Sequence, residues 1–237
     1  MIEQIEDLQF ENLKIVQTKC GYRFTSDSVI LANFVKAKSD ANVIEFCSGC
    51  GVISTLVLKK LNLKQIFGIE LQPSLFALAQ KSIKLNNLEN KITFINDKIQ
   101  NYLKYFKHEQ FDVVVCNPPY YKVGSGAQNE NQEINIAKNE IHLTLDEFLQ
   151  ISSTALKFGG NLYFCHNANR LFEIFINLKK FGLTPKEMFF SQGGEFANPT
   201  TVFIRAQKGA RSGIKIFPNL ITNKDGNYIA TIKKLFN

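Results

Sequence analysis

Four consecutive residues, Asn117-Pro118-Pro119-Tyr120, form the most chemically specific pattern in the sequence. The two prolines fix an extended, turned backbone, point its carbonyl groups in one direction and supply no N–H donors. Asn117 adds a side-chain carbonyl. A planar amine on a base or an amide is a poor nucleophile because its lone pair is delocalised, and two acceptors that hold its hydrogens favour a pyramidal, reactive nitrogen. Tyr120 offers a flat face for a flipped base. We interpret these residues as a catalytic loop acting on an amine nitrogen, the alternative being a turn with no chemical role.

A glycine-containing loop, EFCSGCG at residues 45–51, follows an apolar segment that reads as a strand. Gly49 and Gly51 allow a tight turn and a close approach of the backbone to a ligand, and the helix that follows presents free N–H groups. Ser54 stands where the dinucleotide fingerprint has its third glycine, which disfavours pyrophosphate. With an acid at its start, the loop resembles the motif by which methyltransferases hold the methionine part of S-adenosylmethionine. Its candidate cofactor-binding residues are Glu45, Cys47, Gly49 and Gly51.

Two acids end the next two predicted strands. Glu70 lies 19 residues after Gly51, where nucleotide-binding folds place a carboxylate on the ribose hydroxyls. Asp97 ends the third strand, at the usual place of a carboxylate that faces the adenine amine of the cofactor, although it could instead cap the next helix. The residues after these acids, Leu71 and Lys98, are assigned to the same site, and so is Asn117 of the catalytic loop.

These residues must be positioned by a regular alternation of strands and helices. The apolar patterns predict strands at residues 42–46, 65–70, 92–95, 111–116, 161–166, 186–191 and 200–206, and helices at 27–36, 53–61, 73–85, 99–106, 145–158 and 171–181. Such alternation predicts an α/β fold with a doubly wound, mostly parallel sheet. The final pair of strands, joined only by a loop, predicts an antiparallel edge strand. We therefore expect a Rossmann-like, seven-stranded sheet with a short N-terminal β-hairpin within residues 8–24.

We expect one domain over residues 1–237. It comprises an N-terminal hairpin and helix (1–40), the Rossmann-like core (41–206) and a basic C-terminal extension (207–237). Residues 121–139 are rich in Asn, Gln, Gly and Ser and are interpreted as a mobile loop or lid, the alternative being a tolerated surface insertion.

The positive charge is concentrated at the end of the chain. Of the formal net charge of +7, residues 205–237 carry +6, from seven basic residues and one acid. Such a segment suits a polyanionic partner, most often nucleic acid, and equally a solvated basic surface. The candidates for contacts with RNA phosphates are Lys208, Arg211 and Lys215.

Several classes of protein are disfavoured. No apolar run approaches the roughly 18 residues of a membrane span, and the acidic N-terminus is unlike a signal peptide, so a cytoplasmic protein is expected. The five cysteines include one CxxC, Cys47 and Cys50, but no second pair completes a metal site, and no metal is predicted. Three histidines are interpreted as structural or surface residues: His108, His142 and His166. Four phenylalanines are expected to pack in the core rather than line a base pocket: Phe189, Phe190, Phe196 and Phe203.

Taken together, GYRFTSDSVIL (Gly21–Leu31), EFCSGCG, NPPY and GARSGIKI (Gly209–Ile216) resemble the tRNA1(Val) adenine-37 N(6)-methyltransferase family, of the small-domain class. The resemblance covers nearly the whole chain. It implies a monomeric, S-adenosylmethionine-dependent enzyme that methylates the N6 amine of an adenine in tRNA, at position 37 of a valine tRNA. It also implies that Phe24 and Asp27 contact the cofactor. Asn139 departs from the pattern, since relatives often carry histidine there.

Two other functions remain open. A methyltransferase acting on a glutamine amide of a protein such as a release factor would use the same Asn-Pro-Pro-Tyr chemistry. The basic C-terminal segment and the lack of an extra N-terminal helical domain favour RNA. A non-catalytic RNA-binding protein on the same fold is disfavoured because the glycine loop, Glu70 and the catalytic loop are all intact.

Overall fold

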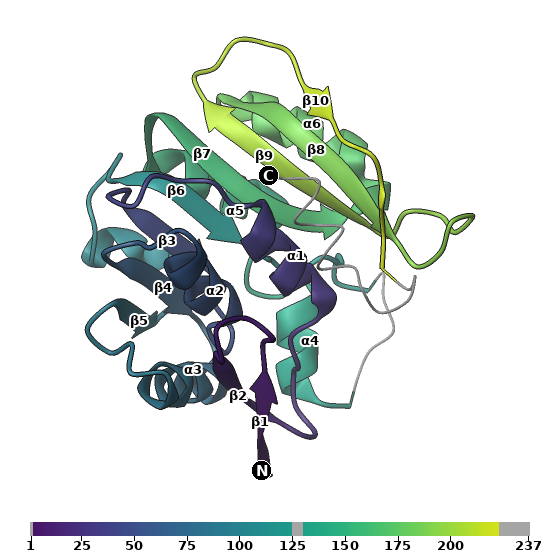
Figure 1. The fold of residues 1–237 in the computed structure, drawn as a ribbon. Coiled ribbons are helices and arrows are strands. Elements are labelled where there is room, and N and C mark those ends of the chain that lie inside the picture. Colours follow the sequence, from purple (N-terminus) through teal and green to yellow (C-terminus); the bar gives the residue numbers. More distant parts are fainter. Residues whose placement is uncertain (1, 125–129, 223–237) are drawn as a thin grey trace.

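The computed structural model describes residues 2–124 and 130–222, which form one central sheet with helices on both faces (Figure 1). The strand order is β10-β8-β9-β7-β6-β3-β4-β5, and β11 also pairs with β8, so this sheet has nine strands within the described residues. The strands are β3 (Val43–Phe46), β4 (Ile66–Glu70), β5 (Ile92–Asn96), β6 (Phe111–Cys116), β7 (Leu156–Asn167), β8 (Leu183–Gln192), β9 (Thr201–Lys208), β10 (Lys215–Ile216) and β11 (Leu220–Ile221).

The predicted fold class is confirmed, with one difference in the place of the antiparallel strand. Strands β5, β4, β3, β6 and β7 are parallel to one another, whereas β9 is antiparallel to both β7 and β8. We expected the antiparallel strand at the edge, but β9 lies inside the sheet. After β7 the chain passes through a helix and forms β8 one position away from β7. It then turns back in a hairpin, and β9 fills the position between β8 and β7. The short strands β10 and β11 then pair beyond β8.

Successive residues of the central strands pack into two separate hydrophobic cores. In β3, Val43 joins the core under α1 (Ser26–Phe34), α2 (Val52–Lys60) and α3 (Pro73–Leu85), whereas Ile44 joins the core under α5 (Leu145–Ala155) and α6 (Leu171–Lys180). In β6, Val113 and Val114 divide in the same way. Coverage on both faces explains why these strands read as continuous apolar runs. The short helix η1 (Ile99–Lys104) follows β5.

The N-terminal hairpin lies earlier in the sequence than the predicted residues 8–24. Its strands are β1 (Glu3–Asp7) and β2 (Lys14–Thr18), so residues 20–24 are not a strand. Residues 8–13, at the start of the predicted range, form the turn of the hairpin, where Leu8 N donates to Leu13 O at 2.9 Å and both side chains are buried. The hairpin docks on α3, because Val16 N donates to Ser82 Oγ at 3.0 Å.

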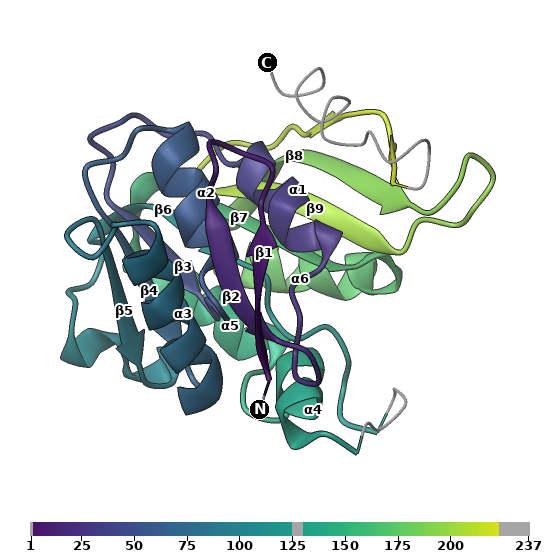
Figure 2. The same ribbon diagram turned by 60° about the horizontal axis from the view of Figure 1, so that its bottom comes forward.

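The segment expected to be a lid contains a helix. Residues 132–138 form α4 (Gln132–Lys138), which Asn131 caps by accepting from Glu133 N, and residues 125–129 lie outside the described part. Figure 2 shows α4 at the edge of the molecule where β1 begins and β2 ends.

The chain after β9 runs back along the outer edge of β8. There, Thr222 N donates to Gln192 O at 2.9 Å, at the end of β8. The basic residues beyond this point lie outside the described residues: Lys224, Lys233 and Lys234. Within residues 2–124 and 130–222, no helix is both long enough and apolar enough to cross a membrane.

Candidate active site

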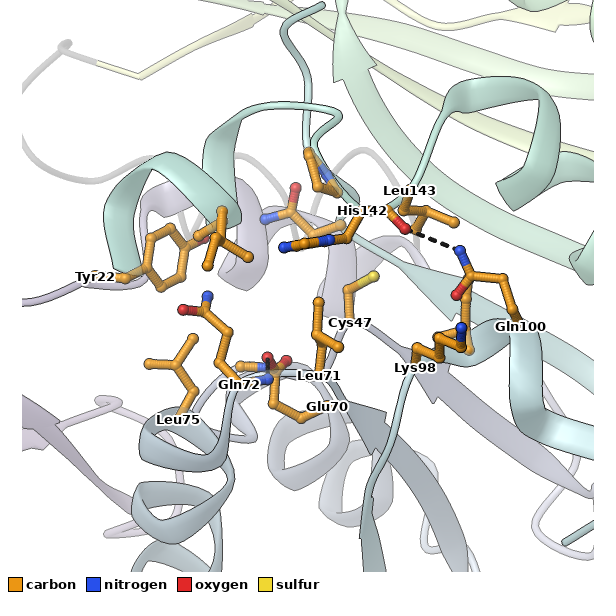
Figure 3. Close-up of a pocket in the computed structure, with 16 residues that line it drawn as sticks. Tyr22, Cys47, Glu70, Leu71, Gln72, Leu75, Lys98, Gln100, His142 and Leu143 are labelled. Carbon is orange, nitrogen blue, oxygen red and sulfur yellow. Dashed lines mark hydrogen bonds between the residues drawn. The ribbon is translucent and has the colours of Figure 1, made fainter. Parts of the chain in front are cut away.

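Two adjoining pockets lie at the carboxyl ends of the parallel strands, where doubly wound folds bind ligands. The first is lined by residues that follow β3, β4, β5 and β6, and Figure 3 shows Glu70, Leu71 and Gln72 along one side with His142 and Leu143 opposite. The second, with a volume of about 490 Å³, lies toward β7 and β9. Three residues line both pockets and mark where they meet: Tyr22, Asn117 and Ala137.

The glycine loop brings Cys47 and Gly49 to the first pocket. Gly49 has a φ of +55°, a conformation that favours glycine, and a Cβ there would point at the Tyr22 ring, 4.0 Å away. Gly51 does not line the pocket. Its φ is +86°, and a Cβ would lie 2.7 Å from Phe94, so its glycine is needed for the packing of α2 against the sheet.

Glu70 lies in the first pocket, as its place at the end of β4 predicts. Its carboxylate accepts from Gly49 N at 2.7 Å and from Gln72 N at 2.8 Å, so it joins the glycine loop to the start of α3. Burial raises its pKa to about 6. Each carboxylate oxygen keeps a lone pair for a further donor.

Glu45 does not line either pocket. It is buried beneath the loop, where it accepts from Ser54 N at 2.8 Å and from the Ser54 hydroxyl. Burial raises its pKa to about 8. The structure therefore gives Glu45 the role of fixing α2 to the end of β3, and it does not bring the carboxylate to the candidate cofactor site.

Asp97 is likewise held outside the pocket. Its carboxylate accepts from Asn101 Nδ2 at 2.7 Å, Lys98 N at 2.8 Å and the Tyr105 hydroxyl at 2.9 Å. The hydrogen bond from Asn101, followed by that from Tyr105, lowers its pKa to about 2. Asp97 is not the N-cap of η1 either, because that position is Lys98 and no side chain caps the helix there. The assigned residues that do line the pocket after β4 and β5 are Leu71 and Lys98.

The sequence missed several residues of the first pocket. Gln72, Leu75 and Gln100 continue segments that we had already assigned, so proximity in sequence could have found them. His142 had no such signal, and we interpreted it as structural or surface. Its ring points into the pocket (Figure 3), and its carbonyl accepts from Gln100 Nε2 at 2.8 Å.

The Asn-Pro-Pro-Tyr loop lies at the junction of the two pockets, with Pro119 facing the first and Pro118 and Tyr120 facing the second. Asn117 Oδ1 accepts from the Tyr120 hydroxyl at 2.7 Å and from the Cys165 thiol at 3.2 Å, and Nδ2 donates to Ser28 Oγ at 3.3 Å. Burial raises the pKa values of the Tyr120 hydroxyl and the Cys165 thiol, so both stay protonated and able to donate. The side-chain carbonyl of Asn117 thus has a fixed orientation.

A mostly buried ion pair holds this loop from outside. Arg170 Nη1 donates to Tyr120 O at 3.0 Å and pairs with Glu140 Oε1 at 2.6 Å. The same Glu140 oxygen accepts from Leu145 N at 3.0 Å, at the start of α5. The loop is therefore tied to β7, α5 and α6 as well as to its own strand.

The two residues assigned by resemblance alone are not together. Asp27 lines the second pocket, where it accepts from the Thr201 hydroxyl at 3.3 Å, and burial raises its pKa. The Tyr120 hydroxyl lies equally far from Asp27, but its one hydrogen points to the nearer Asn117 Oδ1. Phe24 lines neither pocket and packs against the core on the α1 side.

The structure does not bring the three basic candidates to the pockets. Lys208 ends β9 at the end of the sheet opposite the pockets, where the parallel strands begin. Its Nζ lies 2.9 Å from Glu109 and donates to two carbonyls at and just after the end of α5. Arg211 and Lys215 follow on the exposed return segment. Over residues 2–124 and 130–222, no three His, Cys, Asp or Glu side chains cluster as a metal site would need.

Comparison with known families gives the class of the protein. The sequence model of the family "Methyltransferase small domain" matches residues 20–182, more than half of the chain. The chain belongs to this family. The predicted small-domain methyltransferase class is therefore confirmed, and the family match contains the glycine loop, Glu70 and the Asn-Pro-Pro-Tyr loop.

A curated relative and two solved structures resemble this methyltransferase small domain. The tRNA1(Val) (adenine(37)-N6)-methyltransferase of Haemophilus influenzae (strain PittEE) is 28% identical over 156 residues, which cover 65% of this chain and 66% of the relative, just under two thirds of its length. A predicted O-methyltransferase from Agrobacterium tumefaciens has a TM-score of 0.69 at 16% identity, over 89% of this chain and 96% of that one. TYW2 of M. jannaschii, solved in complex with AdoMet, has a TM-score of 0.58 at 15% identity, over 86% and 85%.

Proposed function

We propose that this protein is an S-adenosylmethionine-dependent methyltransferase that modifies the N6 amine of an adenine in tRNA, at position 37 of a valine tRNA. The observation that carries the proposal is that Asn117 lines both pockets, so its amide lies where a cofactor in the first and a base in the second would meet. We further propose that the enzyme acts as a monomer and that this tRNA modification takes place in the cytoplasm.

The residues that line the first pocket suit the chemistry of S-adenosylmethionine. Glu70 offers carboxylate lone pairs for ribose hydroxyls, and Gly49 leaves open the space that a Cβ would enter. Leu71 and Leu75 supply apolar surface for the adenine ring. The bound cofactor would supply an electrophilic methyl group at a sulfonium.

The second pocket suits a base that is turned out of a nucleic-acid loop. Asn117 Oδ1 and the Pro118 carbonyl would accept the two hydrogens of the target amine. Oδ1 already accepts from Tyr120 at 2.7 Å and Cys165 at 3.2 Å, and because a thiol is a weak donor, the amine takes the place of Cys165. Tyr120 then keeps the carbonyl aimed while its ring lines the base pocket. No strong base is required, since the nitrogen becomes acidic only once it is methylated.

The choice of tRNA rests on the relatives. The H. influenzae relative is named for adenine 37 of tRNA1(Val), and this chain carries a formal charge of +7, which suits a polyanionic substrate. An amide of a protein poses the same electronic problem at nitrogen, so the experiment must offer both substrates.

The test is single-turnover methyl transfer from labelled S-adenosylmethionine to unmodified bulk tRNA and, in parallel, to a protein extract. We expect label in N6-methyladenosine of a valine tRNA. Asn117→Ala should lower the rate on the order of 100-fold, the cost of one well-placed polar contact to a reacting group, while cofactor affinity stays unchanged. Label only in protein would contradict the proposal, and so would a parental rate in Asn117→Ala.

A further inference from the structure

One aromatic side chain is exposed where the sequence predicted a buried one. Phe196, on the loop between β8 and β9, is 98% exposed, whereas Phe189 and Phe203 are buried in the core as expected. Phe196 lies two residues before Asn198, which lines the second pocket together with Pro199. Two residues span at most about 7 Å, so Phe196 stands close to the mouth of that pocket.

The loop that carries Phe196 is held in a defined shape by hydrogen bonds. Gln192 Nε2 donates to the carbonyls of Gly194 at 2.8 Å and Glu195 at 3.0 Å, and Ala197 N donates to Gly194 O at 3.1 Å. Gln192 is itself buried and accepts from Asn219 Nδ2 at 2.8 Å. Figure 1 shows the loop extending beyond the rest of the sheet. The exposed ring is therefore presented by a braced backbone.

A second exposed aromatic, Tyr121, reaches the same pocket from the loop after β6. It is 39% exposed and lines the second pocket directly after the catalytic loop. Its backbone is fixed, because Tyr121 N donates to Lys138 O at 3.0 Å and Tyr121 O accepts from Glu140 N at 2.8 Å. Since β7 lies between β6 and β9, Tyr121 and the Phe196 loop approach the pocket from two sides.

We infer that Tyr121 and Phe196 are stacking platforms for the unpaired RNA bases on either side of the target adenine. Aromatic side chains bind splayed bases of single-stranded loops through their flat faces, without reading sequence. Lys138 is exposed and lines the same pocket, so it adds a positive charge that can contact the RNA phosphate backbone. The loop that carries Phe196 contains one acid, Glu195. The inference rests on the proposed function and adds to it that the substrate is held by three bases, not by the target alone.

The experiment uses the full-length chain and a 17-nucleotide RNA hairpin whose seven-nucleotide loop carries the target adenine. Fluorescence anisotropy gives the dissociation constant, and single-turnover methylation gives the rate. Phe196→Ala and Tyr121→Ala should each weaken binding about 5- to 140-fold, which corresponds to about 1–3 kcal/mol for one stacked base at 1.4 kcal/mol per tenfold. Phe158→Ala is the matched control, because Phe158 is also exposed (77%) but lies near the start of β7, at the end of the sheet away from the second pocket. It should leave binding unchanged.

A second substrate shows whether the loss comes from stacking. In hairpins with an abasic site on one side of the target or the other, each alanine variant should lose its effect with one of the two abasic hairpins, because the ring then has no base to contact. Tyr121→Phe should bind like the parent. Equal losses on intact and abasic hairpins, or losses below twofold, would overturn the inference. If the parent chain methylates no RNA, the proposed function fails instead, and the two failures are distinct.

Discussion

We predict that cofactor binding depends on pH through the carboxyl group of Glu70, whose pKa is set by its burial. Burial raises its pKa to about 6 in the free protein. Ribose hydroxyls donate to an ionised carboxylate, so the ionised form should bind S-adenosylmethionine more tightly. Lowering the pH through 6 protonates Glu70 and should therefore weaken binding.

The size of the effect follows from the ionised fraction. With a pKa near 6, roughly nine tenths of the carboxyl groups are ionised at pH 7 and about one tenth at pH 5, so affinity should fall about tenfold over this range. Unfolding does not explain such a loss. Because the folded pKa of Glu70 lies above its unfolded value of about 4.5, this group's contribution to stability is fully present below 4.5 and declines as the pH rises toward 6.

Calorimetric titration at pH 5, 6 and 7 measures this dependence, and two variants locate it. Glu70→Gln should bind weakly at every pH, with a flat profile, because one amide hydrogen then faces the N–H of Gly49 or Gln72. Glu45→Gln is the matched control, since Glu45 is buried beneath the same loop but does not line the pocket, and its affinity should stay within about twofold of the parent. If Glu70→Gln keeps the parental pH profile, or if Glu45→Gln abolishes it, the reasoning that places Glu70 on the ribose is wrong.

Two further predictions concern α4, which lies beside the first pocket, and Lys208. The Glu133 carboxylate accepts from Tyr22 N at 2.8 Å and from the Ser74 hydroxyl at 2.6 Å, which ties α4 over the first pocket, so Glu133→Ala should speed cofactor dissociation in stopped-flow measurements by about tenfold or more. Ser74→Ala, which removes one of the two contacts, should show a smaller increase, and equal rates in both variants and the parent would mean that α4 does not retain the cofactor. Lys208→Ala should lower the melting temperature without changing how RNA affinity depends on salt, because Nζ is already engaged by Glu109 and two carbonyls. A flatter salt dependence would return Lys208 to the RNA interface.

The parts of the site that the sequence could predict are those that depend on the end of a strand. Gly49, Glu70 and Asn117 each lie at or just after the carboxyl end of an apolar strand, and in a parallel sheet such ends meet on one side whatever the side chains do. The same logic predicts α3, whose bounds at Pro73 and Leu85 agree with the pattern, since a proline at the first turn and an apolar stripe fix a helix locally.

The parts that the sequence could not predict depend on where a side chain turns after its strand ends. Glu45 and Asp97 occupy the expected positions, but Ser54 and Asn101 draw their carboxylates away from the pocket. The sequence cannot distinguish an acid that faces a ligand from one that is held by protein donors. Ser54 and Asn101 become neighbours of these carboxylates only after folding. His142 shows the reverse case, in which a residue without any motif is carried to the pocket by the segment after α4.

Asn117 combines both kinds of information, and this is why its role needs the structure. The motif names an amide, but an amide presents either a donor or an acceptor, and only the acceptor can hold the hydrogens of an amine. The amide nitrogen donates to Ser28 of α1, 89 residues away in sequence. The carbonyl oxygen faces two donors, the hydroxyl of Tyr120 and the thiol of Cys165, which lies in β7, 48 residues away. A chain with the same four residues but without these partners would leave the amide free to turn. The chemistry of the loop is therefore specified by the packing of α1 and β7 against it as much as by its own sequence.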